Sequence, residues 1–325
     1  VMHALVTYGL PAVVVAVAGL YFITKARGGK PKRTKPLEQV EIPKFTYEGL
    51  QQDETQKELF LQWMNTEGFT VLTLNEELQE LVELYWALTR KFFSKPTDYK
   101  VQYKGKPKYK DDIFEGKRQV NKGYLTVQEK EFLKLCLDDP SQTLPEDIEG
   151  LEKTFCSLCE GMEEIMKFLY TTIASSMDTA SQKPVHDKEA MDVVLDCVRQ
   201  GSSVSMINYH PIRNSEARTV DNRDAPTEKT HFPSSTHYDT GFLTMIMCSN
   251  VPALQVQDRT TGGWFMPEKL CEAKKDCFVI IGKKMEQFAS FNNPESKLFK
   301  ATLHRVMMPY NLQRNSLLYF QDVPQ

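Results

Sequence analysis

Two histidines and one aspartate in the C-terminal part of the sequence could together bind a metal ion. His237 and Asp239 are two positions apart in the stretch STHYDTGFLTMI, at the head of an apolar run. Because alternate residues of a strand share a face, the imidazole and the carboxylate are expected to project to the same side. His304 follows later, in a strand-like run that ends at Pro309. Two histidines and one carboxylate are the set that holds Fe(II) on one face and leaves other coordination positions open.

A second pair of side chains, Arg314 and Ser316, is spaced for one face of a following strand. A guanidinium can bind a carboxylate through two parallel hydrogen bonds, and a hydroxyl beside it can add another. Iron alone does not need such an anchor. A keto acid that binds iron at one end and presents a free carboxylate at the other does need it. An isolated His-x-Asp is usually no metal site, but these residues in this order on consecutive predicted strands favour one.

The elements that must position these residues are short strands. After residue 200 the chain contains six β-branched or apolar runs broken by Gly, Pro, Asn and Asp, namely SSVSMINYHP, FLTMIMCSN, ALQVQD, DCFVIIG, KATLHRVMMP and NSLLYF. Such a series predicts an antiparallel double-layer sheet or jelly roll in residues 200–325. Helical spacing dominates residues 38–199, with a helix expected to end at Gly68 and another to be capped by Asn75. An unusually long loop is expected at 213–235, with His231 exposed to solvent.

The composition limits the other classes of function. The formal net charge is −3, which gives no reason to expect a nucleic-acid surface. Seven cysteines, an odd number, do not suggest a disulfide framework, so reduced thiols are expected. Cys156 and Cys159 form a CxxC within a predicted amphipathic helix. Without a second pair, they are interpreted as core and flank rather than as half of a zinc or redox site.

The N-terminal end has the pattern of a membrane anchor. Residues 4–24 carry no charge, and a helix of that length spans roughly 30 Å, about one hydrocarbon core. The next stretch, KARGGKPKRTKP, carries only basic charges, which places it on the cytosolic side. A cleaved signal peptide would carry basic residues before the apolar run, and a buried helix would need a polar face. We therefore expect a single-pass transmembrane anchor (1–24) and a basic tether (25–37), with the rest facing the cytosol.

Several motifs resemble one known family. The stretch 200–320 is similar to the iron(II)/2-oxoglutarate-dependent dioxygenase superfamily, specifically its isopenicillin N synthase-like branch. The matching motifs are NYHP (208–211), THYD (236–239), LQVQDRTTGGW (254–264), LHRV (303–306) and RNS (314–316). The N-terminal half resembles the helical cap of that branch through the looser motifs IPKF, GF at 68–69, Phe92-Phe93 before Lys95-Pro96, and Gly123-Tyr124.

The resemblance implies an α+β fold with a double-stranded β-helix (jelly roll) core and an N-terminal helical cap. It implies a dioxygenase that hydroxylates, desaturates or cyclises a small organic or lipophilic substrate, with O2 as oxidant and ascorbate as a candidate reductant. The catalytic metal, Fe(II), would be held by His237, Asp239 and His304. The 2-oxoglutarate cosubstrate would be bound by four residues, which are Arg314, Ser316, Asn208 and His210. His210 stands where the branch often has a second tyrosine, and it could equally cap a strand edge.

Two alternatives remain open at this stage. Some members of the same branch oxidise their substrate without 2-oxoglutarate although they contain Arg-x-Ser. A catalytically silent scaffold at the membrane is the other alternative, and the complete set of metal ligands argues against it. The chain begins with Val1 and stops after a strand-like run, so we expect it to lack terminal residues. Where the branch often reads Gly-Asp in a strand turn, this chain has Gly282-Lys283.

Overall fold

The computed structural model describes residues 35–105, 108–112, 116–120, 122–127, 129–137, 143–181, 201–210, 230–249, 251–291, 298–309 and 312–322. The predicted membrane anchor and most of the basic tether lie outside these residues. Within the described part of the chain, no helix combines the length and the apolar character that crossing a bilayer requires.

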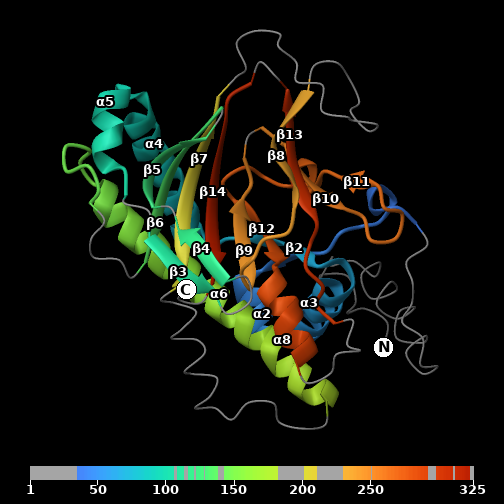
Figure 1. The fold of residues 1–325 in the computed structure, drawn as a ribbon. Coiled ribbons are helices and arrows are strands. Elements are labelled where there is room, and N and C mark those ends of the chain that lie inside the picture. The colour runs from blue at the N-terminus through green and yellow to red at the C-terminus, as the bar shows by residue number, and fades with distance from the viewer. Residues whose placement is uncertain are drawn as a thin grey trace, which may run out of the picture.

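A large mixed sheet forms the centre of the molecule (Figure 1). Its eight strands follow the order β1-β2-β12-β9-β14-β7-β6-β5. Their bounds are β1 Lys44–Thr46, β2 Phe69–Thr73, β5 Gly123–Val127, β6 Lys130–Cys136, β7 Ser203–Tyr209, β9 Leu243–Met247, β12 Asp276–Ile281 and β14 Arg314–Gln321. All neighbours pair antiparallel except β1 and β2. Half of these strands precede residue 200, so the N-terminal region, in which helical spacing dominates, also contributes strands to the large sheet.

A smaller sheet of four strands packs against one face of the large sheet (Figure 1). Its order is β11-β10-β13-β8, and its strands are β8 Thr230–His237, β10 Leu254–Gln257, β11 Trp264–Phe265 and β13 His304–Pro309. Two further strands, β3 Lys108–Asp112 and β4 Gly116–Val120, form a separate hairpin. Strand β8 includes His231, so the predicted loop at 213–235 is wrong for its last six residues. The two packed sheets are consistent with the predicted jelly roll.

Helices lie on the other face of the large sheet and around its end. They are α2 Tyr47–Gln52, α3 Glu54–Glu67, α4 Glu76–Ser94, α5 Thr97–Lys100, α6 Leu151–Ser181 and α8 Lys283–Phe291, with the 3-10 turns η1 Leu37–Gln39, η2 Val101–Tyr103 and η3 Pro267–Leu270. The predicted boundaries are confirmed at two places. The Asn75 side chain accepts from the N–H of Leu78 at 2.9 Å, and Gly68 ends α3 in the left-handed conformation at φ 83°.

The two faces of the large sheet serve different purposes. The face toward α4 and α6 carries the main apolar core, which includes Leu133, Met206, Met245, Val279 and Leu317 and the fully buried stripe of α6. The opposite face meets the smaller sheet in two further apolar clusters, and these contain residues of both sheets. Because strand residues alternate between the faces, neighbouring positions of one strand belong to different environments.

The described cysteines form no disulfide bonds. All six that the structure describes are free. In α6, Cys156 is exposed while Cys159 points into the core, where burial raises the pKa of its thiol. A redox pair needs a thiol with a lowered pKa. The interpretation of this CxxC as core and flank therefore agrees with its surroundings.

A buried carboxylate, Glu131, joins the sheet to the helical region. It accepts hydrogen bonds from the Lys100 amine and the Tyr124 hydroxyl on one oxygen, and it contacts His210 Nε2 at 2.6 Å and Asn208 Nδ2 at 3.3 Å on the other. We call these five residues the Glu131 network. Burial raises the pKa of Glu131, but its hydrogen bonds with Lys100, Tyr124 and His210 outweigh that effect and lower the pKa below its usual value.

The lowered pKa of Glu131 predicts a pH-dependent contribution to stability. A carboxyl group whose pKa falls on folding stabilises the protein above its unfolded pKa, and this stability is lost as the pH drops through the folded pKa. Glu131→Gln should therefore lower the free energy of unfolding at pH 7 by about 3 kcal/mol, because Lys100 is left buried without its counter-charge. The difference from wild type should shrink as the pH falls below the usual carboxyl value of 4.5.

Denaturant unfolding of both proteins between pH 7 and pH 3.5 checks this prediction. Glu129→Gln is the matched control, since Glu129 lies two residues away outside the network. A stability difference that stayed constant over the whole pH range would show that the charge of Glu131 is not the cause.

Candidate metal centre

The two histidines of the predicted metal set lie opposite each other on neighbouring strands. His237 is the last residue of β8, His304 is the first of β13, and the two are direct partners in the antiparallel register. Asp239 lies beyond the end of β8, in the connection to β9. The imidazole and the carboxylate do project to the same side, as expected, but Asp239 does not belong to the strand that contains His237. The turn after the strand, and not the strand's alternation, directs its carboxylate toward the histidines.

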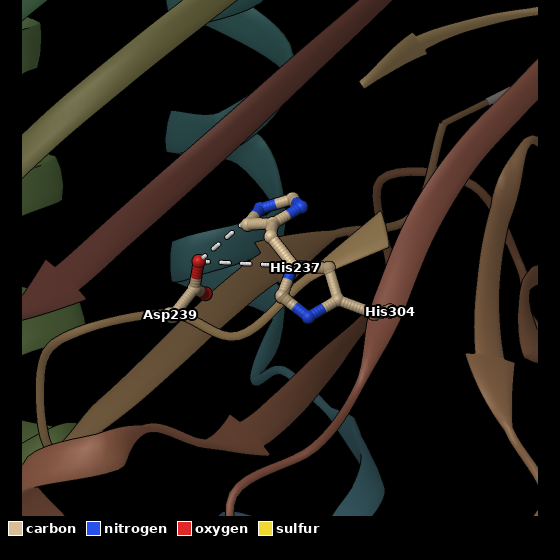
Figure 2. A group of neighbouring side chains, drawn as sticks. All are labelled: His237, Asp239 and His304. Atoms are coloured by element: carbon tan, nitrogen blue, oxygen red, sulfur yellow. Dashed lines mark ion pairs between the residues drawn. The ribbon is translucent and has the colours of Figure 1, made fainter. Parts of the chain in front are cut away.

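The three side chains converge on one point, as Figure 2 shows. Asp239 Oδ1 lies 3.6 Å from His237 Nε2 and 3.7 Å from His304 Nε2. Two atoms that each lie about 2.1 Å from one ion are at most about 4.2 Å apart, so both distances permit a shared ion. One ligand atom from each residue lies within 4.8 Å of the other two.

Backbone carbonyl groups orient both imidazoles for metal binding. His237 Nδ1 lies 2.7 Å from the carbonyl oxygen of Ser235, and His304 Nδ1 lies 3.0 Å from that of Thr302. A carbonyl oxygen only accepts, so each Nδ1 carries the proton and each Nε2 presents its lone pair to the site. Burial, followed by the nearby His304, lowers the pKa of His237, which favours the neutral form that binds metals.

The carboxylate of Asp239 also has the character of a ligand. Its Oδ2 atom is buried and has no hydrogen-bond partner among the described residues. A buried carboxylate oxygen without a partner is costly unless a cation or a donor completes it. Neutral imidazoles with one carboxylate suit Fe(II) and similar divalent ions. The residues present therefore fit the predicted metal.

Backbone packing beneath Asp239 holds the turn in place. The carbonyl oxygen of Asp239 accepts a hydrogen bond from the N–H of Lys283 at 2.8 Å. The N–H of Gly282 donates to the carbonyl oxygen of Phe242, also at 2.8 Å. A Cβ on Gly282 would lie 2.2 Å from the carbonyl oxygen of Gly241 and 3.1 Å from that of Asp239. Only glycine fits at this position. The Gly282-Lys283 pair thus supports the metal-ligand turn through its backbone.

Arg314 lies on the face of β14 that meets the smaller sheet, but its charge is already paired. The residue is 1% exposed, and its Nη2 atom donates to Glu268 Oε1 at 2.8 Å. Its Nε donates to the carbonyl oxygen of Val251 at 3.1 Å, while Nη1 is buried without a partner among the described residues. Ser316 is buried two residues further along the same face. The Nη1 group of the guanidinium, which has no partner among the described residues, thus remains for a ligand.

The partner of Arg314 was not expected from the sequence. Glu268 lies in the turn η3 and is almost fully buried. Its other oxygen accepts from the N–H groups of Ala253 and Leu254 at 2.6 and 2.7 Å. Sequence spacing contains no signal for this pairing, because the two residues meet only through the packing of η3 against β14.

Asn208 and His210 do not lie with Arg314. Asn208 is on the helix-facing side of β7, and both residues belong to the Glu131 network. The prediction that they bind the cosubstrate is not supported by these positions. The residue between them, Tyr209, is the direct neighbour of Arg314 across β7 and β14, with the guanidinium 5.3 Å from its ring centre. The NYHP motif therefore places its tyrosine, and not Asn208, on the face of the large sheet that meets the smaller sheet.

Similar folds occur among solved structures. The sequence matches no protein-family model, and no curated protein matches it. The full-length T7H of Neurospora crassa in complex with alpha-KG has a TM-score of 0.64 and 18% identity, covering 90% of this chain and 88% of its own. The dioxygenase for auxin oxidation 1 of Arabidopsis thaliana, in a 2-oxoglutarate complex, has a TM-score of 0.63 and 16% identity, covering 88% of this chain and 94% of its own. The dioxygenase for auxin oxidation in rice has a TM-score of 0.61 and 17% identity, covering 88% of this chain and 84% of its own.

These likenesses establish the fold. Each covers most of both chains, so the shared architecture includes the helical region as well as the packed sheets. The predicted α+β class is confirmed, and the packed sheets are consistent with the predicted jelly roll. At such low identity, the function has to be argued from the residues of this chain.

The close packing at Gly282 predicts that an added methyl group disturbs the metal centre. In Gly282→Ala, the turn that contains Asp239 must shift to relieve the contact with Gly241. We expect the affinity for a divalent metal to fall roughly ten- to a hundred-fold, as for other changes that misplace a ligand. Titration of the purified protein with Mn(II) or Co(II) measures this affinity.

The matched control is Gly263→Ala, whose Cβ would meet only Thr261 Oγ1 at 3.3 Å. This variant should bind metal as the wild type does. Wild-type affinity in folded Gly282→Ala would mean that the turn does not determine the position of Asp239.

Proposed function

We propose that the protein is a non-haem Fe(II)- and 2-oxoglutarate-dependent dioxygenase that hydroxylates, desaturates or cyclises a small organic or lipophilic substrate. The observation that carries this proposal is the convergence of His237 Nε2, His304 Nε2 and the carboxylate of Asp239 on one point. Three protein ligands on one side of an ion leave its other positions open for small molecules. The proposal also draws on the neighbours crystallised with alpha-KG, one of them together with thymine.

Different residues of the chain would bind the metal, exclude water and bind the cosubstrate. With Fe(II), 2-oxoglutarate and O2 bound, the site would supply oxidative chemistry in which the keto acid is converted to succinate and carbon dioxide. His237, Asp239 and His304 would hold the metal, and their Nδ1 contacts with Ser235 and Thr302 would keep the imidazoles in place. The apolar residues between the two sheets would keep water away from the reacting groups. Arg314 and Ser316 would lie at the far end of the keto acid.

A second candidate is an iron oxidase of the same fold that does not use 2-oxoglutarate. The ion pair between Arg314 and Glu268 favours it, because the guanidinium that would bind the keto acid already has an internal counter-charge. The scaffold alternative has less support, since three converging metal ligands serve no purpose in a silent protein.

Oxygen-dependent conversion of 2-oxoglutarate to succinate tests the proposal. The purified chain, reconstituted with Fe(II) without oxygen and then exposed to it, should form succinate. His237→Ala should reduce the rate to that of the metal-free protein, because two remaining ligands bind the ion weakly. Equal rates in the two proteins would refute the proposal. An Fe(II) spectrum that 2-oxoglutarate leaves unchanged in the absence of oxygen would instead favour the second candidate.

We also propose that residues 1–24 anchor the protein in a membrane, with residues 25–37 and the rest of the chain on the cytosolic side. The support is the uncharged run at 4–24 and the exclusively basic segment after it. When the chain is expressed in cells, alkaline carbonate should leave it in the membrane pellet, and a variant that starts at residue 38 should remain in the supernatant. Protease added to sealed vesicles should digest the body of the chain. Release of the whole chain by carbonate would contradict the anchor.

A further inference from the structure

The interior between the two sheets contains a second cation besides Arg314. Lys130 is the first residue of β6, where it pairs with Tyr209 of β7, and Tyr209 in turn pairs with Arg314 of β14. Directly opposed residues of an antiparallel pair share a face, so all three project toward the smaller sheet. With strands about 4.8 Å apart, they form one row across the sheet.

The amine of Lys130 reaches across to the strand that contains a metal ligand. Its Nζ atom donates to the hydroxyl of Ser234 on β8 at 3.4 Å, three residues before His237. Ser234 and His237 belong to the same strand, so this contact brings the amine toward the metal centre. Burial lowers the pKa of Lys130. Tyr209 lies between the two cations. Burial raises the pKa of its hydroxyl, and the charge of Arg314 and the hydrogen bond with Ser234 make this rise smaller.

Lys130 differs from Arg314 in having no ion-pair partner among the described residues, although the charge of Glu129 is near enough to raise its pKa. Among the described residues, no carboxylate lies within ion-pair distance of its amine, whereas Glu268 neutralises Arg314. In the part of the chain that the structure describes, the Lys130 amine contacts the neutral hydroxyl of Ser234 and lies 5.6 Å from the ring centre of Phe132, and a half-buried ammonium in such surroundings can bind an anion. The Nη1 group of Arg314 and the hydroxyl of Tyr209 are further donors in the same row, and the hydroxyl of Ser234 faces them from β8.

The charges of the proposed complex require such a cation. Fe(II) would be balanced by Asp239 and by the carboxylate next to the keto group of the cosubstrate. The second carboxylate of 2-oxoglutarate then needs a positive charge that the Arg314–Glu268 pair, neutral as a whole, does not provide. Lys130 lies on the same face as Arg314, and none of the described carboxylates forms an ion pair with it.

We propose that Lys130 binds the distal carboxylate of 2-oxoglutarate, with Arg314 supplying only a hydrogen bond from Nη1. This inference rests on the proposed function. Lys130 is thereby a second determinant of cosubstrate choice, selecting keto acids that end in a carboxylate. The Arg-x-Ser motif alone does not provide that selectivity in this chain.

The test compares two keto acids that differ only at the far end. 2-Oxoglutarate and 2-oxobutyrate share the metal-binding group, but 2-oxobutyrate has no distal carboxylate. Isothermal titration calorimetry with the Mn(II)-loaded chain in the absence of oxygen measures both affinities. In Lys130→Gln and Lys130→Met, the affinity for 2-oxoglutarate should fall roughly ten- to a hundred-fold, as expected for the loss of one charged hydrogen bond. The affinity for 2-oxobutyrate should stay within about two-fold, as expected if the metal end of the site is unchanged.

Three controls make the result specific. Lys134→Gln removes a half-buried lysine from the same strand and the same face, where the amine lies over Phe320, and it should leave both affinities unchanged. Lys130→Arg keeps the charge and should retain most of the affinity for 2-oxoglutarate. Glu268→Gln in the Lys130→Gln background should restore affinity, because Arg314 then becomes a free cation.

The outcomes separate this inference from the proposed function. If the wild type binds 2-oxoglutarate and the Lys130 variants keep the same preference over 2-oxobutyrate, the role of Lys130 is refuted and the dioxygenase proposal stands. Equal losses for the two keto acids would likewise refute it, since they would indicate general damage to the site. If the Mn(II)-loaded wild type binds no 2-oxoglutarate at all, both proposals are refuted.

Discussion

The antiparallel pairing of β8 with β13 is the constraint on which the candidate site depends. It places His237, the last residue of one strand, directly opposite His304, the first residue of the other. Neither imidazole could then turn away without losing its Nδ1 contact to the backbone. The third ligand comes from outside the sheet, on a turn that Gly241 and Gly282 allow to pack closely. Strand pairing therefore sets two ligands, and backbone packing sets the third.

The large sheet separates stability from chemistry by its two faces. The face toward α4 and α6 carries the main core and the Glu131 network, in which a buried carboxylate satisfies groups from α5, β5 and β7. The other face presents Lys130, Tyr209 and Arg314 to the smaller sheet. Lys130 and Glu131 are consecutive in sequence but lie on opposite sides. A single strand, β6, thus contributes to both environments because its side chains alternate.

The balance of buried charge explains how the interior can remain selective. Arg314 and Glu268 compensate each other inside the protein, which holds η3 and the segment before β10 against β14. Such a pair costs little as long as both members and their hydrogen bonds are intact. Lys130, whose long side chain reaches Ser234 from the opposite sheet, forms no ion pair with the described carboxylates. Arg314 thus stabilises the structure, whereas Lys130 is the residue proposed to select the ligand.

The sequence by itself determined the types of residue at the metal centre and several of the local elements. His-x-Asp followed by a later histidine, the series of short apolar runs, and the helix boundaries at Gly68 and Asn75 are all local patterns. Tertiary structure decided which face each polar residue occupies. It moved Asp239 off the strand, assigned Asn208 and His210 to Glu131, gave Arg314 the partner Glu268, and brought Lys130 to Ser234. The physical reason is strand register. One residue of shift exchanges the two faces of a strand, and register is set by pairing partners that lie far apart in the chain.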